Sequence, residues 1–216
     1  MEEAQVQSAT RWTRRKQARP AEILDAALSV FAEKGYAGTR MDEIAHRAGV
    51  TKGTIYLYFA SKEAVFKTLV RESIGAILSG VSADVASLPG TAKDLLRFAL
   101  QRTAHFLMTS DRVVLPKIIV AESGNFPELA RFYRDEVIAK GMAMMAALIE
   151  RGIAQGEFRH VPVQHAVRLC IAPVMLSAMW RTTFAQFDPE PYDYKGLIDT
   201  HLDVLFHGLS AEGDIL

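Results

Sequence analysis

The sequence has few of the residues from which enzyme and redox sites are built. Its one cysteine, Cys170, stands in an apolar run, which excludes a disulfide framework within the chain and favours a buried small hydrophobe. The six histidines form neither an HExxH pattern nor a cluster with cysteine or carboxylate, and no GxGxxG, P-loop or GxSxG motif occurs. We therefore expect no enzyme, no metal site and no cofactor.

Long apolar runs are also missing. No stretch reaches the roughly 20 residues that a membrane-spanning helix needs. The basic N-terminal residues, from Arg11 to Arg19, are not followed by the apolar stretch of a secretory signal. These two absences predict a cytoplasmic protein without a membrane partner.

No convincing strand pattern or internal repeat appears, and apolar residues recur instead at the spacing of amphipathic helices. An all-α chain follows. Residues 1–19 are polar, basic and without periodicity, so they predict a flexible arm. The first helix is expected to begin at about Pro20 and to end at Gly35. Later breaks are expected at 88–90 and 188–191, where proline and glycine gather.

The formal net charge is zero, but it is unevenly distributed. Residues 1–62 hold 10 Lys and Arg against 7 Asp and Glu, a net of +3, and residues 63–216 hold 15 against 18, a net of −3. A basic N-terminal module on an acidic body is expected where only the first part meets phosphate.

The segment 39–66 carries the most specific pattern. Thr39 is placed to cap a first short helix, and Gly49 stands where a left-handed residue ends it. Thr51 is placed to cap a second helix, whose buried side is formed by Ile55 and Phe59. Two short helices joined by a tight turn are typical of a helix-turn-helix, whose second helix enters the DNA major groove.

Three pieces of this region, FAEKGYAGT, IAHRAGVTKGTIYLYF and SKEAVF, resemble the DNA-binding domain of the TetR/AcrR family of bacterial regulators. The resemblance covers about 20–69, and the run 115–137 is similar to one C-terminal subgroup of the family. It implies an N-terminal three-helix helix-turn-helix domain, at 20–66, followed by a larger helical domain for ligand binding and dimerisation, at 67–216.

Basic, hydroxyl and small residues of the motif are the candidates for DNA contact. Thr39 and Arg40 lie at a helix N-terminus, which favours phosphate, and Lys62 also suits a phosphate contact. Lys52 can donate to guanine. For Tyr58, packing against the first helix is the alternative. The full set is Thr39, Arg40, Thr51, Lys52, Gly53, Thr54, Tyr56, Tyr58 and Lys62. In the arm, Arg14 and Arg15 are candidates for the minor groove or phosphates, with a solubilising tail as the alternative.

The larger domain is rich in methionine and phenylalanine, which suit a permissive apolar pocket between helices. Ordinary core packing is the alternative for each residue. His105 or Arg168 would supply a polar anchor. The candidate effector residues are His105, Phe106, Phe132, Met142, Met145, Arg168, Met175, Met179 and Phe184.

The last two helices, at about 162–187 and 194–207, are expected to pair with their copies, as the resemblance implies. A single helix-turn-helix contacts little DNA, so a dimer reading two half-sites is expected. The alternative is that these apolar residues close the core of one subunit. The candidate dimer residues are Ala178, Leu197, Ile198, Leu202, Leu205 and Phe206.

Together these features predict a homodimeric transcriptional repressor that binds a palindromic double-stranded DNA operator and is released by a small apolar or aromatic effector. Two alternatives stay open at this point. One is an effector-independent, architectural DNA-binding protein, and the other is a small-molecule-binding or catalytic helical protein with a vestigial helix-turn-helix.

Overall fold

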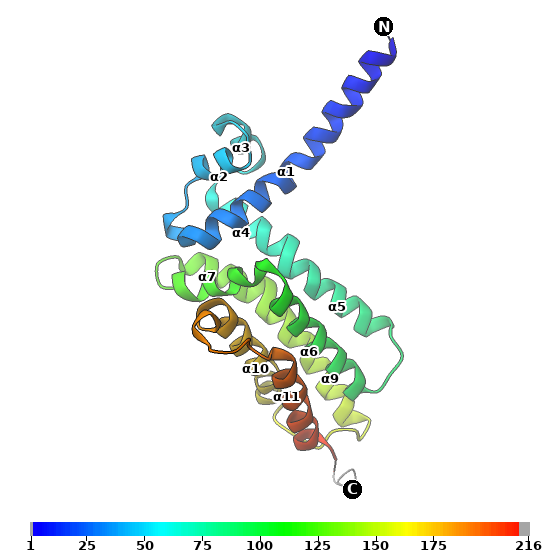
Figure 1. Cartoon of the computed structure of the whole chain (residues 1–216). Helices are drawn as coiled ribbons and strands as arrows, with labels where there is room; N and C mark the ends of the chain where they lie inside the picture. Colours follow the sequence, from blue (N-terminus) through cyan, green and yellow to red (C-terminus); the bar gives the residue numbers. More distant parts are fainter. Residues whose placement is uncertain (1, 212–216) are drawn as a thin grey trace.

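The computed structural model describes residues 2–211, and the side chains of residues 19–211. Within these residues every element is helical apart from an isolated bridge between Phe158 and Ser210. Figure 1 shows a small N-terminal group of helices standing on a longer helical bundle. The predicted all-α class, with an N-terminal helix-turn-helix domain and a larger helical domain, is confirmed.

The N-terminal group packs four helices around aromatic and branched side chains. Phe31 and Phe66 are fully buried, and their rings meet edge to face with centroids 5.3 Å apart. Ile23, Ile44 and Ile55 bring the first three helices onto the same core. The helices are α1 (Glu2–Gly38), α2 (Met41–Arg47), α3 (Lys52–Tyr58) and α4 (Lys62–Val70).

The helix start predicted at Pro20 is wrong, because α1 begins at Glu2 and Pro20 lies inside it. The preceding residues are mostly Glu, Gln, Ala, Arg and Lys, which favour helix without any apolar periodicity. In Figure 1 this first part of α1 projects away from the rest of the molecule. The side chains of Arg14 and Arg15 lie outside the described residues, and their DNA contacts stay a prediction. The predicted break at Gly35 is present, with φ of 68°.

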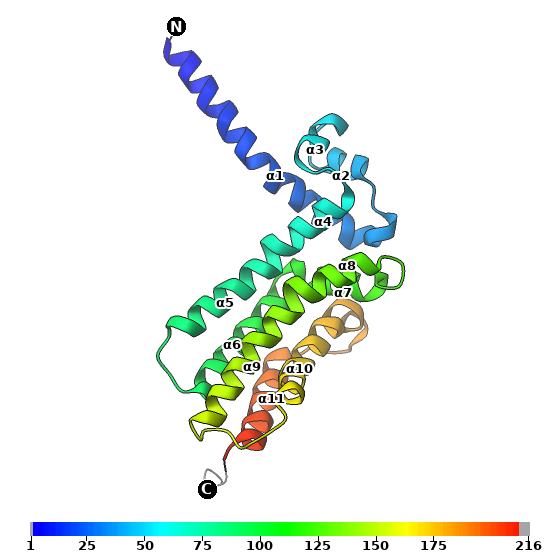
Figure 2. The ribbon, with the colours of Figure 1, turned by 180° about the vertical axis from the view of Figure 1, so that it is seen from behind.

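A long helical shaft links the two parts of the molecule. It consists of α4, the π-helical turn η1 (Arg71–Gly75) and α5 (Ala76–Ser87). Ser61 caps the start of α4, as its hydroxyl accepts a hydrogen bond from the amide of Ala64 at 3.1 Å. The shaft ends before the predicted break at 88–90, and Figure 2 shows it running alongside α6 and α9.

The bundle is built around α6, α9 and α10, whose apolar faces form a second core. Leu96, Leu100 and Ile149 lie at its centre with no exposed surface. A second π-helical turn, η3 (Arg134–Ile138), precedes α9 and contacts the first one, η1, in the shaft. The elements are α6 (Ala92–Thr109), η2 (Asp111–Val113), α7 (Val114–Glu122), α8 (Pro127–Tyr133), η3 (Arg134–Ile138), α9 (Ala139–Ala154), α10 (Val163–Thr183), η4 (Ala185–Phe187) and α11 (Tyr194–Leu209).

The hydrophobic core of the N-terminal helices extends into the larger domain. Leu115 and Ile118 of α7 and Leu129 of α8 are buried in the same cluster as Phe31 and Phe66. The N-terminal helices therefore share their interior with two helices of the larger domain. A displacement of α7 or α8 is transmitted directly to the packing of α1 and α4, because close-packed interiors have no slack.

Among the described residues, α10 is long and apolar enough to cross a membrane by length and composition, with a mean hydropathy of 1.2 in its best window. From the sequence we expect no membrane span. Only 33% of that window is buried within the subunit. A core helix, or a helix covered by another subunit, passes the same test.

Candidate functional site

The turn between α2 and α3 has the geometry expected of a helix-turn-helix. Gly49 adopts φ of 64°, a conformation in which a side chain would be strained. The next amide, of Val50, donates to the carbonyl of Ala45 at 2.9 Å. Thr51 caps α3, its hydroxyl accepting from the amide of Thr54 at 3.1 Å. Ile55 is fully buried and fixes the face of α3 that points inward.

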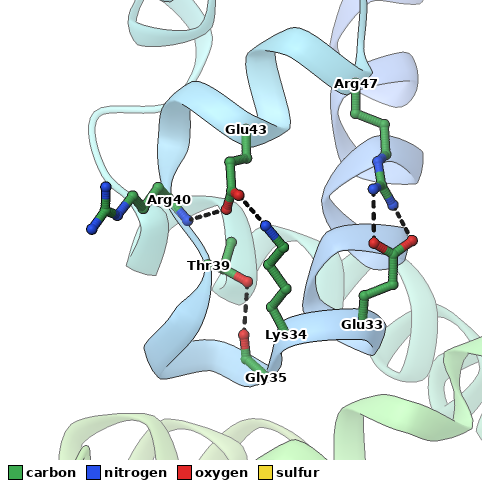
Figure 3. Close-up of polar contacts among 7 residues, drawn as sticks. All are labelled: Glu33, Lys34, Gly35, Thr39, Arg40, Glu43 and Arg47. Atoms are coloured by element: carbon green, nitrogen blue, oxygen red, sulfur yellow. Dashed lines mark hydrogen bonds and ion pairs between the residues drawn. The ribbon is translucent and has the colours of Figure 1, made fainter.

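Ion pairs hold α2 against α1, as Figure 3 shows. The Arg47 guanidinium donates two hydrogen bonds to the Glu33 carboxylate, with Nη2 and Oε2 2.7 Å apart. Lys34 pairs with Glu43, whose carboxylate also accepts from the backbone amide of Arg40 at 3.3 Å. These donors hold the pKa of Glu33 and of Glu43 below the ordinary value. The pairs orient the helix-turn-helix relative to α1.

The capping role predicted for Thr39 is wrong. The N-cap of α2 is Arg40, and the Thr39 hydroxyl instead donates to the carbonyl of Gly35 at 2.7 Å. Thr39 is 2% exposed and its amide donates to the carbonyl of Tyr36, so its polar groups are occupied within the chain. Its burial disfavours the predicted phosphate contact. The Arg40 side chain is exposed and points away from this network in Figure 3, which suits a phosphate contact.

The outer face of α3 presents the residues proposed to approach bases. Lys52 and Gly53 are exposed, and Tyr56 is 46% exposed. The Lys52 ammonium lies 3.1 Å from the Asp42 carboxylate, so α2 orients it across the front of the motif. Leu57 is 83% exposed on the same helix. Leu57 is not among the residues predicted to contact DNA, because an apolar residue within a helix is ordinarily assigned to a core.

Tyr58 and Lys62 lie closer to the interior than expected. Tyr58 is partly buried against the N-terminal core, in line with the packing alternative. The Lys62 ammonium donates to the carbonyls of Tyr36 at 2.6 Å, Ala37 at 3.3 Å and Thr39 at 2.9 Å. It also lies 4.4 Å from the centroid of the Tyr36 ring, and desolvation lowers its pKa. These contacts fasten α4 to the end of α1.

The candidate effector residues do not gather in one place. Met145 lies in the core of the bundle, and His105 and Phe184 are exposed. Met142 and Arg168 line one groove, between η3, α9 and α10. Around the bundle core, Phe106, Met142 and Met175 pack as partly buried neighbours. Core packing therefore accounts for part of the set, including Met145.

A different groove lies where the two π-helical turns face each other. It measures about 610 Å³ and runs between the shaft and the start of α9. Its apolar side chains include Leu78, Val137 and Met144. Its charged side chains are Arg71, Glu136 and Lys140, and the Lys140 ammonium lies 2.7 Å from the Glu136 carboxylate. The Arg71 guanidinium lies 4.8 Å from the ring centroid of Phe132. Sequence periodicity alone does not reveal this groove, since it depends on the π-helical turns.

Most of the residues assigned to the dimer surface belong to the core of the subunit, which corrects that assignment. Four of them are at most 4% exposed, namely Ala178, Ile198, Leu202 and Phe206. Leu197 and Leu205 keep partial exposure. The outward apolar face instead carries Leu169, Leu176 and Val204, which are 65%, 62% and 65% exposed. A groove of about 500 Å³ between α10 and α11 includes Leu169 and Val204.

Comparisons with known proteins identify the family of this fold. Residues 23–69 match "Bacterial regulatory proteins, tetR family", and residues 89–191 match "Tetracyclin repressor-like, C-terminal domain". The chain is 27% identical over 197 residues to the fatty acid metabolism regulator protein of Bacillus subtilis, covering 90% of this chain and 98% of that protein. It is 30% identical over 156 residues to the HTH-type transcriptional regulator YdeS of the same organism, covering 70% and 74%.

A solved structure of the B. subtilis regulator FadR in complex with stearoyl-CoA is also similar. It has a TM-score of 0.69 and 26% identity, with coverage of 87% of this chain and 98% of that chain. The two matched domains account for the helix-turn-helix and for most of the helical bundle, and this family is one of DNA-binding regulators rather than enzymes. The chain belongs to the TetR family of bacterial transcriptional regulators.

Proposed function

We propose that this protein is a cytoplasmic, ligand-responsive repressor that binds a palindromic operator as a homodimer and is released by an amphipathic acyl ligand of the acyl-CoA class. The acyl-CoA class is narrower than the small apolar or aromatic effector expected from the sequence, because its members also carry an anionic head group. The similarity to a fatty acid metabolism regulator and to a stearoyl-CoA complex supports the ligand class.

The groove between η1 and η3 carries the proposal. A π-helical turn widens a helix locally, and such turns are frequent at functional sites. Here two of them contact each other across a groove with an apolar floor that includes Leu78 and Met144. An acyl chain would lie on this floor, because burial removes its surface from water. Arg71 and Lys140 in its lining would receive the phosphate groups of a nucleotide head, with Lys140 exchanging its ion pair with Glu136 for the phosphate.

The position of the groove suggests how the ligand would act. Arg71 follows directly on α4, the helix whose Lys62 is bonded to the end of α1. A ligand that favours one arrangement of η1 therefore biases the orientation of the helix-turn-helix. A coupling of about 1–3 kcal/mol would reduce operator affinity several-fold to a hundredfold.

Dimerisation is supported by the outward faces of α10 and α11. Leu169, Leu176 and Val204 are each more than 60% exposed, although large apolar side chains on one face normally find a partner. A second copy of the same face would cover them, and a two-fold dimer would present two copies of α3 to successive major grooves.

The proposal is tested by titrating the purified protein with acyl-CoA thioesters of increasing chain length, beside free coenzyme A and free fatty acids. An effector of this class should raise the melting temperature by mass action and dissociate the operator complex. The operator itself would come from selection out of a random DNA library. Ser79→Trp, which fills the groove, should abolish the thermal shift while sparing operator binding. Ser123→Trp, on an exposed turn outside the groove, is the matched control.

Acyl-CoA binding that leaves operator affinity unchanged would remove the regulatory part of the proposal. Absence of any thermal shift across the series, together with intact operator binding, would favour the alternative of an effector-independent DNA-binding protein.

A further inference from the structure

Leu57 has no packing role within the subunit. It lies on α3, between the partly exposed Tyr56 and the partly buried Tyr58, and is 83% exposed. That is the largest exposed fraction among the large apolar side chains of the described residues. The inward face of α3 is taken by Ile55, which is fully buried, and Leu57 points to the opposite side of the helix.

Gly53, one helical turn before Leu57, shares this outward face. A glycine inside a helix weakens it relative to alanine. Nothing in the chain requires glycine here, because its φ is not in the left-handed region and an added Cβ would meet only Thr51 Oγ1, at 3.9 Å. The space over Gly53 is therefore open, and a close approach by a partner explains the residue better than the fold does.

Side chains on a helix lean toward its N-terminus, so that of Leu57 extends toward the open space over Gly53. The two residues form a ridge with an apolar tip, flanked by the exposed Lys52 and Tyr56. We propose that Leu57 determines operator sequence by contacting the C5-methyl group of a thymine, with Gly53 allowing the α3 backbone to come close enough. This inference rests on the proposed reading of the operator by α3.

The chemistry of the major groove selects thymine. Adenine, guanine and cytosine present donors and acceptors there, and thymine alone adds a methyl group. A leucine side chain set against a donor or acceptor would strip it of water without replacing the hydrogen bond, which is unfavourable. Against a methyl group the same side chain gains contact and removes apolar surface from water.

The test removes the methyl group without changing base pairing. Each thymine of the selected operator is replaced in turn by deoxyuridine, at equivalent positions of both half-sites, and affinity is measured by fluorescence anisotropy at fixed salt. At one position the wild-type protein should lose about fourfold per half-site, the change that burial of one methyl group gives. Leu57→Ala should bind the unmodified operator more weakly and should no longer distinguish thymine from deoxyuridine at that position.

Two further variants keep the result interpretable. Gly53→Ala should melt at a higher temperature than wild type yet bind the operator more weakly, an opposite pair of effects that a purely structural role cannot produce. Leu88→Ala, a leucine in the connection between α5 and α6 that is 44% exposed, should leave operator affinity unchanged.

The inference is overturned if the wild-type protein is indifferent to deoxyuridine at every thymine, or if Leu57→Ala discriminates as well as wild type does. A library selection that enriches no sequence would instead contradict the proposed operator binding itself. The two failures are therefore distinguishable.

Discussion

The Glu122 carboxylate accepts a hydrogen bond from the backbone amide of Ala37, with Oε1 and N 2.9 Å apart. Glu122 ends α7 in the larger domain, and Ala37 lies in the last turn of α1, after the kink at Gly35. Lys62 reaches the same turn from α4 and donates to the carbonyls of Tyr36, Ala37 and Thr39. The base of the helix-turn-helix is thus held by polar contacts from α4 and from the bundle.

Replacing Glu122 tests this link. Glu122→Ala should lower the free energy of unfolding by about 1 kcal/mol, the usual net value of one hydrogen bond. Hydrogen exchange at the Ala37 amide should accelerate, since its acceptor is lost. Glu122→Gln keeps an acceptor oxygen at the same reach and is the matched control. Equal behaviour of the two variants would show that the hydrogen bond does not hold the turn.

Lys62 offers a second test, because its structural contacts and its predicted phosphate contact have different signatures. Lys62→Met keeps most of the aliphatic stem and leaves the carbonyls of Tyr36, Ala37 and Thr39 without their donor. We expect a loss of about 1–3 kcal/mol in urea unfolding, as for hydrogen bonds to charged groups. The salt dependence of DNA binding should stay close to that of wild type.

A phosphate contact made by Lys62 would show the reverse result. Losing one such contact lowers the slope of log affinity against log salt by about 0.9 per subunit. If Lys62→Met leaves stability unchanged and reduces the salt slope of DNA binding, Lys62 contacts phosphate as expected from the sequence. Lys52→Met, which removes an exposed ammonium paired only with Asp42 of α2, serves as the comparison variant that leaves the base of the domain intact.

Local signals in the sequence were sufficient for the helix-turn-helix. Hydroxyl caps at Thr51 and Ser61 and a left-handed glycine at Gly49 act over three or four residues, so they can be recognised without knowing the fold. Thr39 was assigned wrongly by the same reasoning. Its hydroxyl donates back to the carbonyl of Gly35, four residues earlier, and the sequence alone does not decide between this local hydrogen bond and a forward cap.

The surfaces of α10 and α11 were harder to predict for a different reason. α10 is apolar on several sides, so the buried Val174 and the exposed Leu176 look alike in sequence. Helical periodicity separates apolar from polar faces, but it cannot separate a face that meets the subunit's own core from one that meets a copy. Leu57 is a different case, because the sequence already assigns the buried side of α3 to Ile55 and Phe59, and helical spacing then places Leu57 on the opposite side.

The dimer surface is tested by placing a charge on its exposed part. Leu176→Glu should yield folded monomers of about half the wild-type mass in sedimentation, because an unpaired carboxylate is costly to bury in an apolar interface. Helix content should be retained, since Leu176 is 62% exposed in the subunit. Leu202→Glu, at a fully buried position, should unfold the subunit instead. A wild-type protein that sediments as a monomer at micromolar concentration would contradict the dimer.

The buried thiol of Cys170 predicts how stability changes in alkaline solution. Burial raises the pKa of this thiol from 9.0 to about 11, so the folded state keeps its proton where the unfolded chain loses it. Between those two values the folded state binds more protons, and stability falls as the pH rises. Two pKa units correspond to roughly 3 kcal/mol. Tyr36, whose pKa burial raises to about 12, adds a loss of the same sign above pH 10.

The contribution of Cys170 is isolated by comparison with Cys170→Ala. The variant should be less stable than wild type at pH 7.5, where a cavity is the only change, and the difference should shrink as the pH rises from 9 to 11. Urea unfolding in the presence of reductant measures the stability of the two proteins at each pH. One fixed protein concentration is used, since the stability of a dimer depends on concentration. The remaining alkaline loss, which Tyr36 shares, is common to both proteins and cancels. A difference that stays constant across this range would mean that the thiol ionises equally in both states, and that the interior around α10 is open to water.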